Sequence, residues 1–406
     1  MQKTRSHRMA GRAVMALPVA FVAACSTAAA PVAQTGPAAQ AGPVAQASTA
    51  ARQATGHHAG PATAARAGLP SNRAVRRGQA TESTAATAIT APGTTVPGAS
   101  GCPMFPANNV WNTDISKLPV NSHSAAWLRS MASGSTYLHP DFGPDAGGYP
   151  YGITYNVVTN AYPMVRIRFE YATESDNGPY PFGPGTRIEG GRNADGDRHA
   201  IMVNKSTCML YELYDARYSA KGSTAGSGAI WNLRSNALRP AGWTSADAAG
   251  LPILPGLLNF SQIEAAVRDG RPITHAIRFT AQTTRTAYLW PARHEAGSSS
   301  SRNLPPMGAR FRLKASFEVA RFCRNSAPYC KDAKAVLTEM QHYGLILADN
   351  GSNWYFGGSA FPQWPDALVS LLKGIPARDF QGVNEACLML RRYSGEATAK
   401  PGCPIG

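Results

Sequence analysis

A change of composition near residue 100 decides which part of this chain can fold. Residues 26 to 100 contain no Phe, Tyr or Trp and are dominated by Ala, Thr, Pro, Gly, Ser and Gln. Such a segment cannot bury enough apolar surface to offset the conformational entropy lost on ordering. We therefore expect a disordered linker over residues 26 to 100. Residues 101 to 406, about 300 in number, are enough for a single large globular domain.

The first 25 residues have the pattern of a secretion signal. Lys and Arg residues precede an apolar run from Ala13 to Ala23, which is too short to span a bilayer. The run closes on Val-Ala-Ala-Cys25, which resembles the lipobox of bacterial lipoproteins, where the cysteine is acylated. We expect an exported protein that a lipid on Cys25 attaches to the membrane. Cleavage near residues 28 to 30, which would release an extracellular protein, is the alternative.

Six cysteines lie beyond the linker, and an even number in an exported chain favours disulfides over metal binding. They are Cys102, Cys208, Cys323, Cys330, Cys387 and Cys403. None belongs to a C-x-x-C pair of the kind that binds zinc. We predict a local Cys323–Cys330 bridge, with Cys387 or Cys102 tethering Cys403.

The charge of the globular segment is modest. It carries 30 of the 39 Lys and Arg residues and 23 of the 24 Asp and Glu residues, and they are scattered rather than gathered in runs. Such a balance explains solubility and a weak attraction to anionic cell-surface polymers. No zinc-finger spacing, basic helix or aromatic RNA-binding pattern is present, so we expect no nucleic-acid partner.

Short runs rich in Val, Ile, Tyr, Phe and Thr alternate with Gly, Pro, Asn and Asp clusters, which is typical of strands joined by turns. The predicted strands are residues 153–158, 165–171, 199–204, 208–215, 275–280, 286–290, 310–317 and 345–348. We therefore predict a mainly β fold, an antiparallel β-sandwich or jelly roll with a few peripheral helices.

Three segments have helical patterns. One begins at Ser261, which forms an S-x-x-E capping box with Glu264, and ends at Gly270. A second runs from about Asp332 to Tyr343, and a third lies between Pro365 and Gly374.

The stretch from Gly196 to Asp215 suggests a hairpin that carries chemistry. If Val203 faces Cys208 across the turn, the register places His199 opposite Glu212. Facing side chains on antiparallel strands lie about 5 Å apart, close enough for an imidazole and a carboxylate to act together in acid/base catalysis. A structural ion pair is the competing interpretation, and a one-residue slip would separate the two groups.

Other polar groups could complete such a site. We assign the role of second acid to Glu189 or Asp349, and His275 could approach the pair from another strand. Amide and carboxylate groups beside an aromatic ring suit sugar binding. The predicted sugar-binding residues are Tyr211, Tyr214, Asn350, Asn353 and Trp354, although an Asn-Gly turn explains the last three equally well.

We predict no obligatory cofactor, and no H-E-x-x-H zinc motif is present. Residues 193 to 197, Asn-Ala-Asp-Gly-Asp, space oxygen ligands like the start of a calcium loop, which leaves calcium as an alternative. The glycine stands at the wrong position for an EF-hand, and no distal Glu follows at the required distance.

Four blocks of this sequence resemble a family of secreted bacterial proteins of unassigned activity. They are Gly196–His199 (GDRH), Leu210–Tyr214 (LYELY), Ala249–Gly256 (AGLPILPG) and Leu347–Ser352 (LADNGS). The resemblance spans most of residues 102 to 380. It implies one continuous domain and supplies no reaction.

Together these patterns favour a secreted or lipid-anchored protein that acts on an extracellular polysaccharide or cell-wall glycan. A glycoside hydrolase or a polysaccharide lyase would use Glu212 and His199 with a second acid. The alternatives are a noncatalytic carbohydrate-binding module and a structural envelope lipoprotein.

Overall fold

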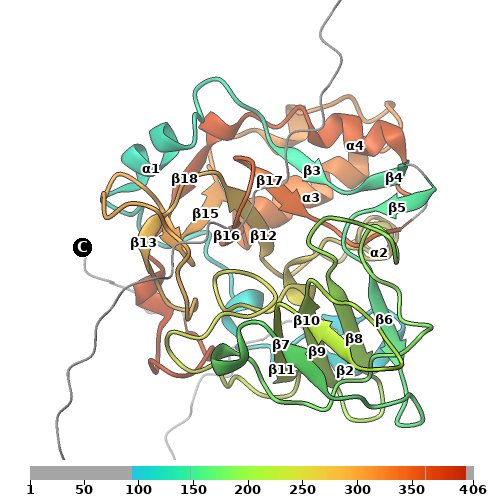
Figure 1. Cartoon of the computed structure of the whole chain (residues 1–406). Coiled ribbons are helices and arrows are strands. Elements are labelled where there is room, and N and C mark those ends of the chain that lie inside the picture. Colours follow the sequence, from blue (N-terminus) through green and yellow to red (C-terminus); the bar gives the residue numbers. More distant parts are fainter. Residues whose placement is uncertain (1–93, 147, 362, 399–406) are drawn as a thin grey trace, which may run out of the picture. The chain divides into compact units, whose positions relative to one another are not determined.

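The computed structural model describes residues 94–146, 148–361 and 363–398 (Figure 1). All of them belong to one compact unit of the chain. The predicted signal segment, Cys25 and most of the predicted linker lie outside the described residues. The linker boundary predicted at residue 100 needs one correction. β1 (Thr95–Val96) pairs with β2 (Ala99–Pro103), and Val96 is fully buried in the core, so the folded part begins before residue 100.

A four-stranded sheet has the order β11-β9-β8-β6, with β11 (Ser227–Asn232), β9 (Met209–Tyr214), β8 (Ala200–Asn204) and β6 (Tyr155–Val158). The first three strands are antiparallel, and β6 lies parallel to β8. At the turn between β8 and β9, the side chain of Asn204 accepts hydrogen bonds from the two backbone amides that follow Lys205. The predicted hairpin is therefore present (Figure 1).

A six-stranded mixed sheet has the order β18-β15-β16-β12-β17-β3. These strands are β18 (Phe380–Gly382), β15 (Arg310–Leu313), β16 (Leu345–Asn350), β12 (Ile277–Ala281), β17 (Tyr355–Gly357) and β3 (His139–Asp141). Side chains alternate across β12, so Phe279 joins a cluster of rings on one face while Arg278 points to the other. Phe279 contacts Trp354 and Phe311, with ring centroids 5.7 and 5.5 Å apart.

Three further strand pairs complete the β structure. They are β4 (Gly143–Ala146) with β5 (Tyr149–Tyr151), β7 (Ile167–Phe169) with β10 (Ser223–Ala225), and β13 (Arg285–Tyr288) with β14 (Pro306–Met307). The prediction of a mainly β fold with few helices is thus confirmed, and both large sheets contain parallel as well as antiparallel neighbours.

The described residues contain four α-helices: α1 (Ser124–Ser130), α2 (Phe260–Asp269), α3 (Cys330–His342) and α4 (Asp366–Leu372). The last three were predicted. The predicted capping box of α2 is wrong, because the helix begins one residue earlier, at Phe260, whose ring packs against Trp364 in the core. Gly270 ends α2 in the left-handed conformation, as its position indicated.

Two disulfides join cysteines within the described residues. Cys323–Cys330 is the predicted local bridge. Cys102 bonds to Cys208 and not to Cys403, because β2 lies beside the turn that carries Cys208. Cys403 lies outside the described residues, so the tether from Cys387 stays a prediction. Disulfides indicate an oxidising compartment, in agreement with export. Within the described ranges, no helix is both long and apolar enough to cross a bilayer.

Candidate active site

The hairpin register differs from the prediction by two residues. Ile201 lies opposite Glu212, and the same register continued places Tyr214 opposite His199, with the two rings 6.0 Å apart. Cys208, predicted to face Val203 in the strand, instead lies in the turn with a left-handed backbone conformation, and the strand begins at Met209. The predicted His199–Glu212 pair is therefore wrong.

Glu212 is fully buried and has a structural role. Its carboxylate accepts hydrogen bonds from the backbone amides of Ile253 and Leu254, at 2.9 Å each, and so holds the start of the short 3₁₀ turn that follows. Burial raises the pKa of Glu212 to about 7, although these two hydrogen bonds act in the opposite direction. A group sealed in this way cannot reach a substrate, so Glu212 is not a catalytic residue.

The partner of His199 is Glu189. Nδ1 of the imidazole lies 2.6 Å from Oε2 of Glu189, and Nε2 lies 3.1 Å from the carbonyl oxygen of Ala246. Because both ring nitrogens face acceptors, the ring is an imidazolium that donates from both. Burial opposes this charge, but the carboxylate of Glu189 outweighs it and raises the pKa of His199 to about 10.

Glu189 is the more accessible member of this pair. Its side chain is 27% exposed, whereas that of His199 is 3% exposed. Burial would raise the pKa of Glu189, but the charge of His199 and hydrogen bonds from it lower the pKa instead. Glu189 is thus a carboxylate held in its ionised form near solvent, with Oε1 left without a hydrogen-bond partner among the described residues.

A second ionic pair lies on the six-stranded sheet. Arg278 of β12 binds Asp247 through two parallel hydrogen bonds, one of them 2.8 Å long from Nε to Oδ2. Asp247 is fully buried and Arg278 nearly so. Burial disfavours the charged guanidinium, but the charge of Asp247 prevails and raises the pKa of Arg278. Removing one partner of such a pair would leave an uncompensated buried charge.

Asp349 reaches Arg278 because of a bulge in β16. The parallel register pairs Phe279 with Leu347 and Thr280 with Asp349, so it skips Ala348. The additional residue turns Asp349 to the face of Arg278, and Oδ2 lies 4.0 Å from the guanidinium nitrogen Nη2. Burial and the negative charge of Asp247 raise the pKa of Asp349 to about 8, against the opposite effect of Arg278. Its side chain remains 23% exposed.

Asp141 of β3 and Tyr151 of β5 border this group. The hydroxyl of Tyr151 donates a short hydrogen bond to Asp141. Burial raises the pKa of Asp141; Arg278 lowers it, and the charges of Glu189 and Asp197 add to the increase. Carboxylates of this group therefore shift one another's pKa, since Glu189 and Asp197 raise that of Asp141, and Asp247 and Asp197 raise that of Asp349.

We call this set the ionic cluster. It consists of Asp141, Glu189, Asp197, His199, Asp247, Arg278 and Asp349. His199, Asp247 and Arg278 are buried, whereas the carboxylates of Glu189 and Asp349 reach solvent. Asp141, Arg278 and Asp349 come from strands of the six-stranded sheet, and the other members come from loops, with His199 directly before β8.

Aromatic rings adjoin the ionic cluster. Tyr355 of β17 stacks on His139 of β3, with centroids 4.1 Å apart and planes inclined by 14°. Tyr151 is 38% exposed, and its pKa is raised by burial, by Asp141 and in part by Tyr355 and Glu189. Tyr214 is half-buried beside His199.

Several predicted site residues lie elsewhere. Trp354 is fully buried and donates its indole N–H to a backbone carbonyl oxygen, so it is a core residue. Asn350 bonds to Thr284 and Ala296, and Asn353 accepts from a backbone amide; both connect loops. His275 is buried beside Glu339 of α3, and Tyr211 packs against Tyr180 on the opposite face of its sheet from Glu212.

The predicted calcium loop already holds a positive charge. Nη1 of Arg198 donates to the carbonyl oxygens of Arg192 and Ala194, at 2.9 and 2.6 Å. The guanidinium of Arg198 therefore lies against the backbone of this segment, and its charge would repel a calcium ion. In the part of the chain that the structure describes, no group of three or more His, Cys, Asp or Glu side chains could hold a metal ion.

Sequence reasoning missed Asp141, Asp247 and Arg278. Arg278 gave one usable signal, because a charge inside the apolar run Ile277–Ala281 must find a buried partner. Asp247, which lies in a loop, gave none.

No protein-family model, curated protein or solved structure matches this chain significantly. The resemblance to a family of secreted bacterial proteins therefore stays an expectation.

Proposed function

We propose that this protein is an exported glycoside hydrolase that cleaves a polysaccharide with Asp349 as general acid and Glu189 as the second carboxylate. The observation that carries the proposal is that two accessible carboxyl groups near Arg278 have pKa values shifted in opposite directions. The pKa of Asp349 is raised to about 8, and that of Glu189 is lowered. A protonated acid beside an ionised carboxylate is the arrangement that glycoside hydrolysis requires.

Each group has a defined task. Asp349 gives its proton to the glycosidic oxygen as the bond to the anomeric carbon breaks, and becomes a carboxylate that Arg278 stabilises. Glu189 either attacks the anomeric carbon or takes a proton from the attacking water. In both cases the net reaction adds one water molecule across the bond. His199 is a positioning residue, because it orients Glu189 and keeps it ionised.

Neighbouring aromatic groups would bind the sugar. The stacked rings of Tyr355 and His139 and the exposed ring of Tyr151 supply apolar surfaces for the C–H face of a pyranose. The carboxylates supply hydrogen-bond acceptors for its hydroxyls. A lyase fits less well, because the pKa of Tyr151, the nearest phenol to the carboxylates, is raised rather than lowered.

The test uses Asp349→Asn and Glu189→Gln against a panel of cell-wall and plant polysaccharides. Each change should reduce kcat by about 10² to 10⁴-fold. Asp269→Asn, an exposed carboxyl at the end of α2, is the matched control and should leave hydrolysis unchanged. Glycosides with an acidic leaving group should partly restore activity to the Asp349 variant, since that leaving group needs no proton.

Two outcomes would contradict the proposal. One is hydrolysis that both variants retain. The other is glycan binding with no product after prolonged incubation of the unchanged protein, which would identify a noncatalytic binding module. Proton NMR of the first anomer released would show whether Glu189 acts as nucleophile, with retention, or as base, with inversion.

The proposal also includes attachment to the membrane through a lipid on Cys25. Its support is the lipobox pattern before that residue. Metabolic labelling with a fatty-acid analogue should mark the chain and should fail for Cys25→Ser. Equal labelling of both proteins would refute acylation at this position.

A further inference from the structure

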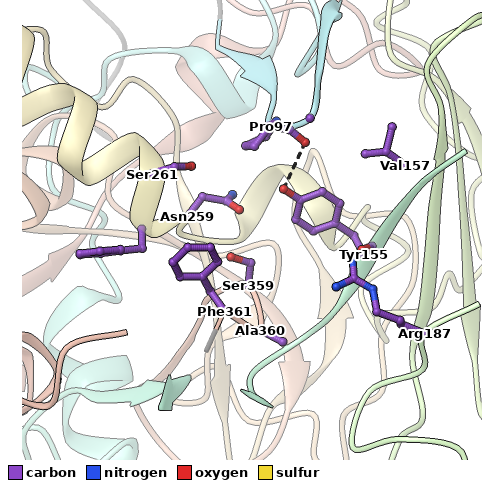
Figure 2. Close-up of a pocket in the computed structure, with 11 residues that line it drawn as sticks. Pro97, Tyr155, Val157, Arg187, Asn259, Ser261, Ser359, Ala360 and Phe361 are labelled. Carbon is purple, nitrogen blue, oxygen red and sulfur yellow. Dashed lines mark hydrogen bonds between the residues drawn. The ribbon is translucent and has the colours of Figure 1, made fainter. Parts of the chain in front are cut away.

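A pocket of about 480 Å³ lies beside β6 and the start of α2, outside the ionic cluster (Figure 2). Pockets of this size bind small organic ligands. Asn259, Ser359 and Phe361 lie on one side of it, and Tyr155 and Arg187 lie on the other (Figure 2). Its walls thus combine aromatic rings, short polar side chains and one cation.

Arg187 is an exposed cation that is fixed in place. Its Nη2 donates to the carbonyl oxygen of Tyr155 at 2.6 Å, and its backbone amide donates to the side chain of Asn156 at 2.9 Å. Across the described ranges, no carboxylate lies within ion-pair distance of its guanidinium. The guanidinium therefore presents free N–H donors to the pocket, in a geometry that matches a carboxylate.

The aromatic rings that line the pocket are also held in place by neighbouring groups. The hydroxyl of Tyr155 donates to the carbonyl oxygen of Pro97, and this hydrogen bond fixes the ring on its side of the pocket (Figure 2). Phe260 and Phe361 contact each other with centroids 6.0 Å apart. Apolar ring faces favour the C–H face of a sugar, while Asn259 and Ser359 offer polar partners for hydroxyl groups.

Two chain segments lead from the pocket directly to the ionic cluster. Glu189 follows Arg187 by two positions, a distance along the chain of at most about 7 Å. Gly357, which packs against the side chain of Arg278, is likewise two residues from Ser359. The pocket therefore lies within a few residues of Glu189 and of the glycine that packs against Arg278.

We infer that this pocket is a subsite for a uronic acid residue, whose carboxylate binds Arg187 while its ring packs against the aromatic walls. The inference rests on the proposed glycoside hydrolase activity and adds the substrate class, a polysaccharide that contains uronic acid. Arg187 sets the specificity, and the cleaved bond lies beside the bound uronate, at Asp349 and Glu189.

The experiment measures binding and cleavage separately. Binding of trigalacturonate and trimannuronate is measured by calorimetry on the Asp349→Asn protein, with the neutral methyl ester of each sugar as the matched ligand. Adding Arg187→Gln should weaken binding of a recognised uronate by about tenfold or more and leave its methyl ester within about twofold. Arg271→Gln, an exposed arginine elsewhere, is the control and should change neither.

The outcomes separate this inference from the proposed function. If the protein hydrolyses a neutral polysaccharide, and Arg187→Gln has no effect on any uronate, the pocket assignment is refuted while the hydrolase stands. If Arg187→Gln selectively weakens uronate binding but no polymer is cleaved, the subsite is supported and the hydrolase is refuted. Equal weakening of the acid and its methyl ester would refute the carboxylate contact itself.

Discussion

Replacing Glu189 by Gln should destabilise the protein by an amount that depends strongly on pH. The change keeps the shape of the side chain and removes the negative charge that holds His199 as an imidazolium. The pKa of His199 rises from 6.5 to about 10 in the folded protein. One pH unit between two pKa values corresponds to about 1.4 kcal/mol, so this difference corresponds to about 5 kcal/mol.

The sign follows from which state binds the proton more tightly. The folded state holds the proton of His199 more tightly than the unfolded state does, so the stabilisation is complete below pH 6.5 and is lost as pH rises through about 10. The Gln variant lacks it. We expect the variant to lose about 3 to 5 kcal/mol of unfolding free energy at pH 6 and little at pH 10.

Urea unfolding followed by tryptophan fluorescence, at pH 6 and pH 10, measures this difference against the unchanged protein at the same pH. Glu318→Gln, which removes one partner of the exposed ion pair with Arg321, is the control and should show no pH-dependent change. A loss of equal size at both pH values, or one below about 1 kcal/mol at pH 6, would refute the reasoning.

Three further changes test other parts of the structure. Asp247→Asn removes a charge that raises the pKa of Asp349, so the alkaline limb of the activity profile should move to lower pH; an unchanged limb would contradict the coupling. Glu339 is buried without a hydrogen-bond partner, and burial raises its pKa well above 4.5. The ionised carboxyl therefore lowers stability as pH rises above 4.5. Thermal melts should show that Glu339→Met gains more stability at pH 9 than at pH 5, and equal gains at the two pH values would contradict an origin in the buried charge. Replacing Cys102 and Cys208 by Ser opens a bridge between residues 106 apart and should lower the unfolding free energy by about 2 to 5 kcal/mol, a result that an unchanged urea midpoint would rule out.

Local patterns predicted most of the fold. Short runs rich in Val, Ile, Tyr, Phe and Thr located β6, β8, β9 and β12, and Gly270 ended α2 with positive φ as expected. The Cys323–Cys330 bridge followed from short spacing alone. These features depend on neighbours in sequence, which is why they could be read from it.

The site was predicted only in part, because it depends on register. Glu189, His199 and Asp349 do join one cluster, but the partner of His199 was misassigned. The turn includes Cys208, so the hairpin register differs by two residues from the predicted one, and Asp247 meets Arg278 across 31 positions of the chain. Neither event leaves a trace in local propensity.

The bulge at Ala348 gives β16 one residue that has no partner in β12. Its carbonyl oxygen accepts from the amide of Ala249, in the loop that carries Asp247. A homologue that lacks this residue would keep a carboxylate opposite Thr280 but lose that anchor, whereas one shortened at position 349 would present an alanine there. Variation in strand length, and not only substitution, would therefore decide which side chain faces Arg278.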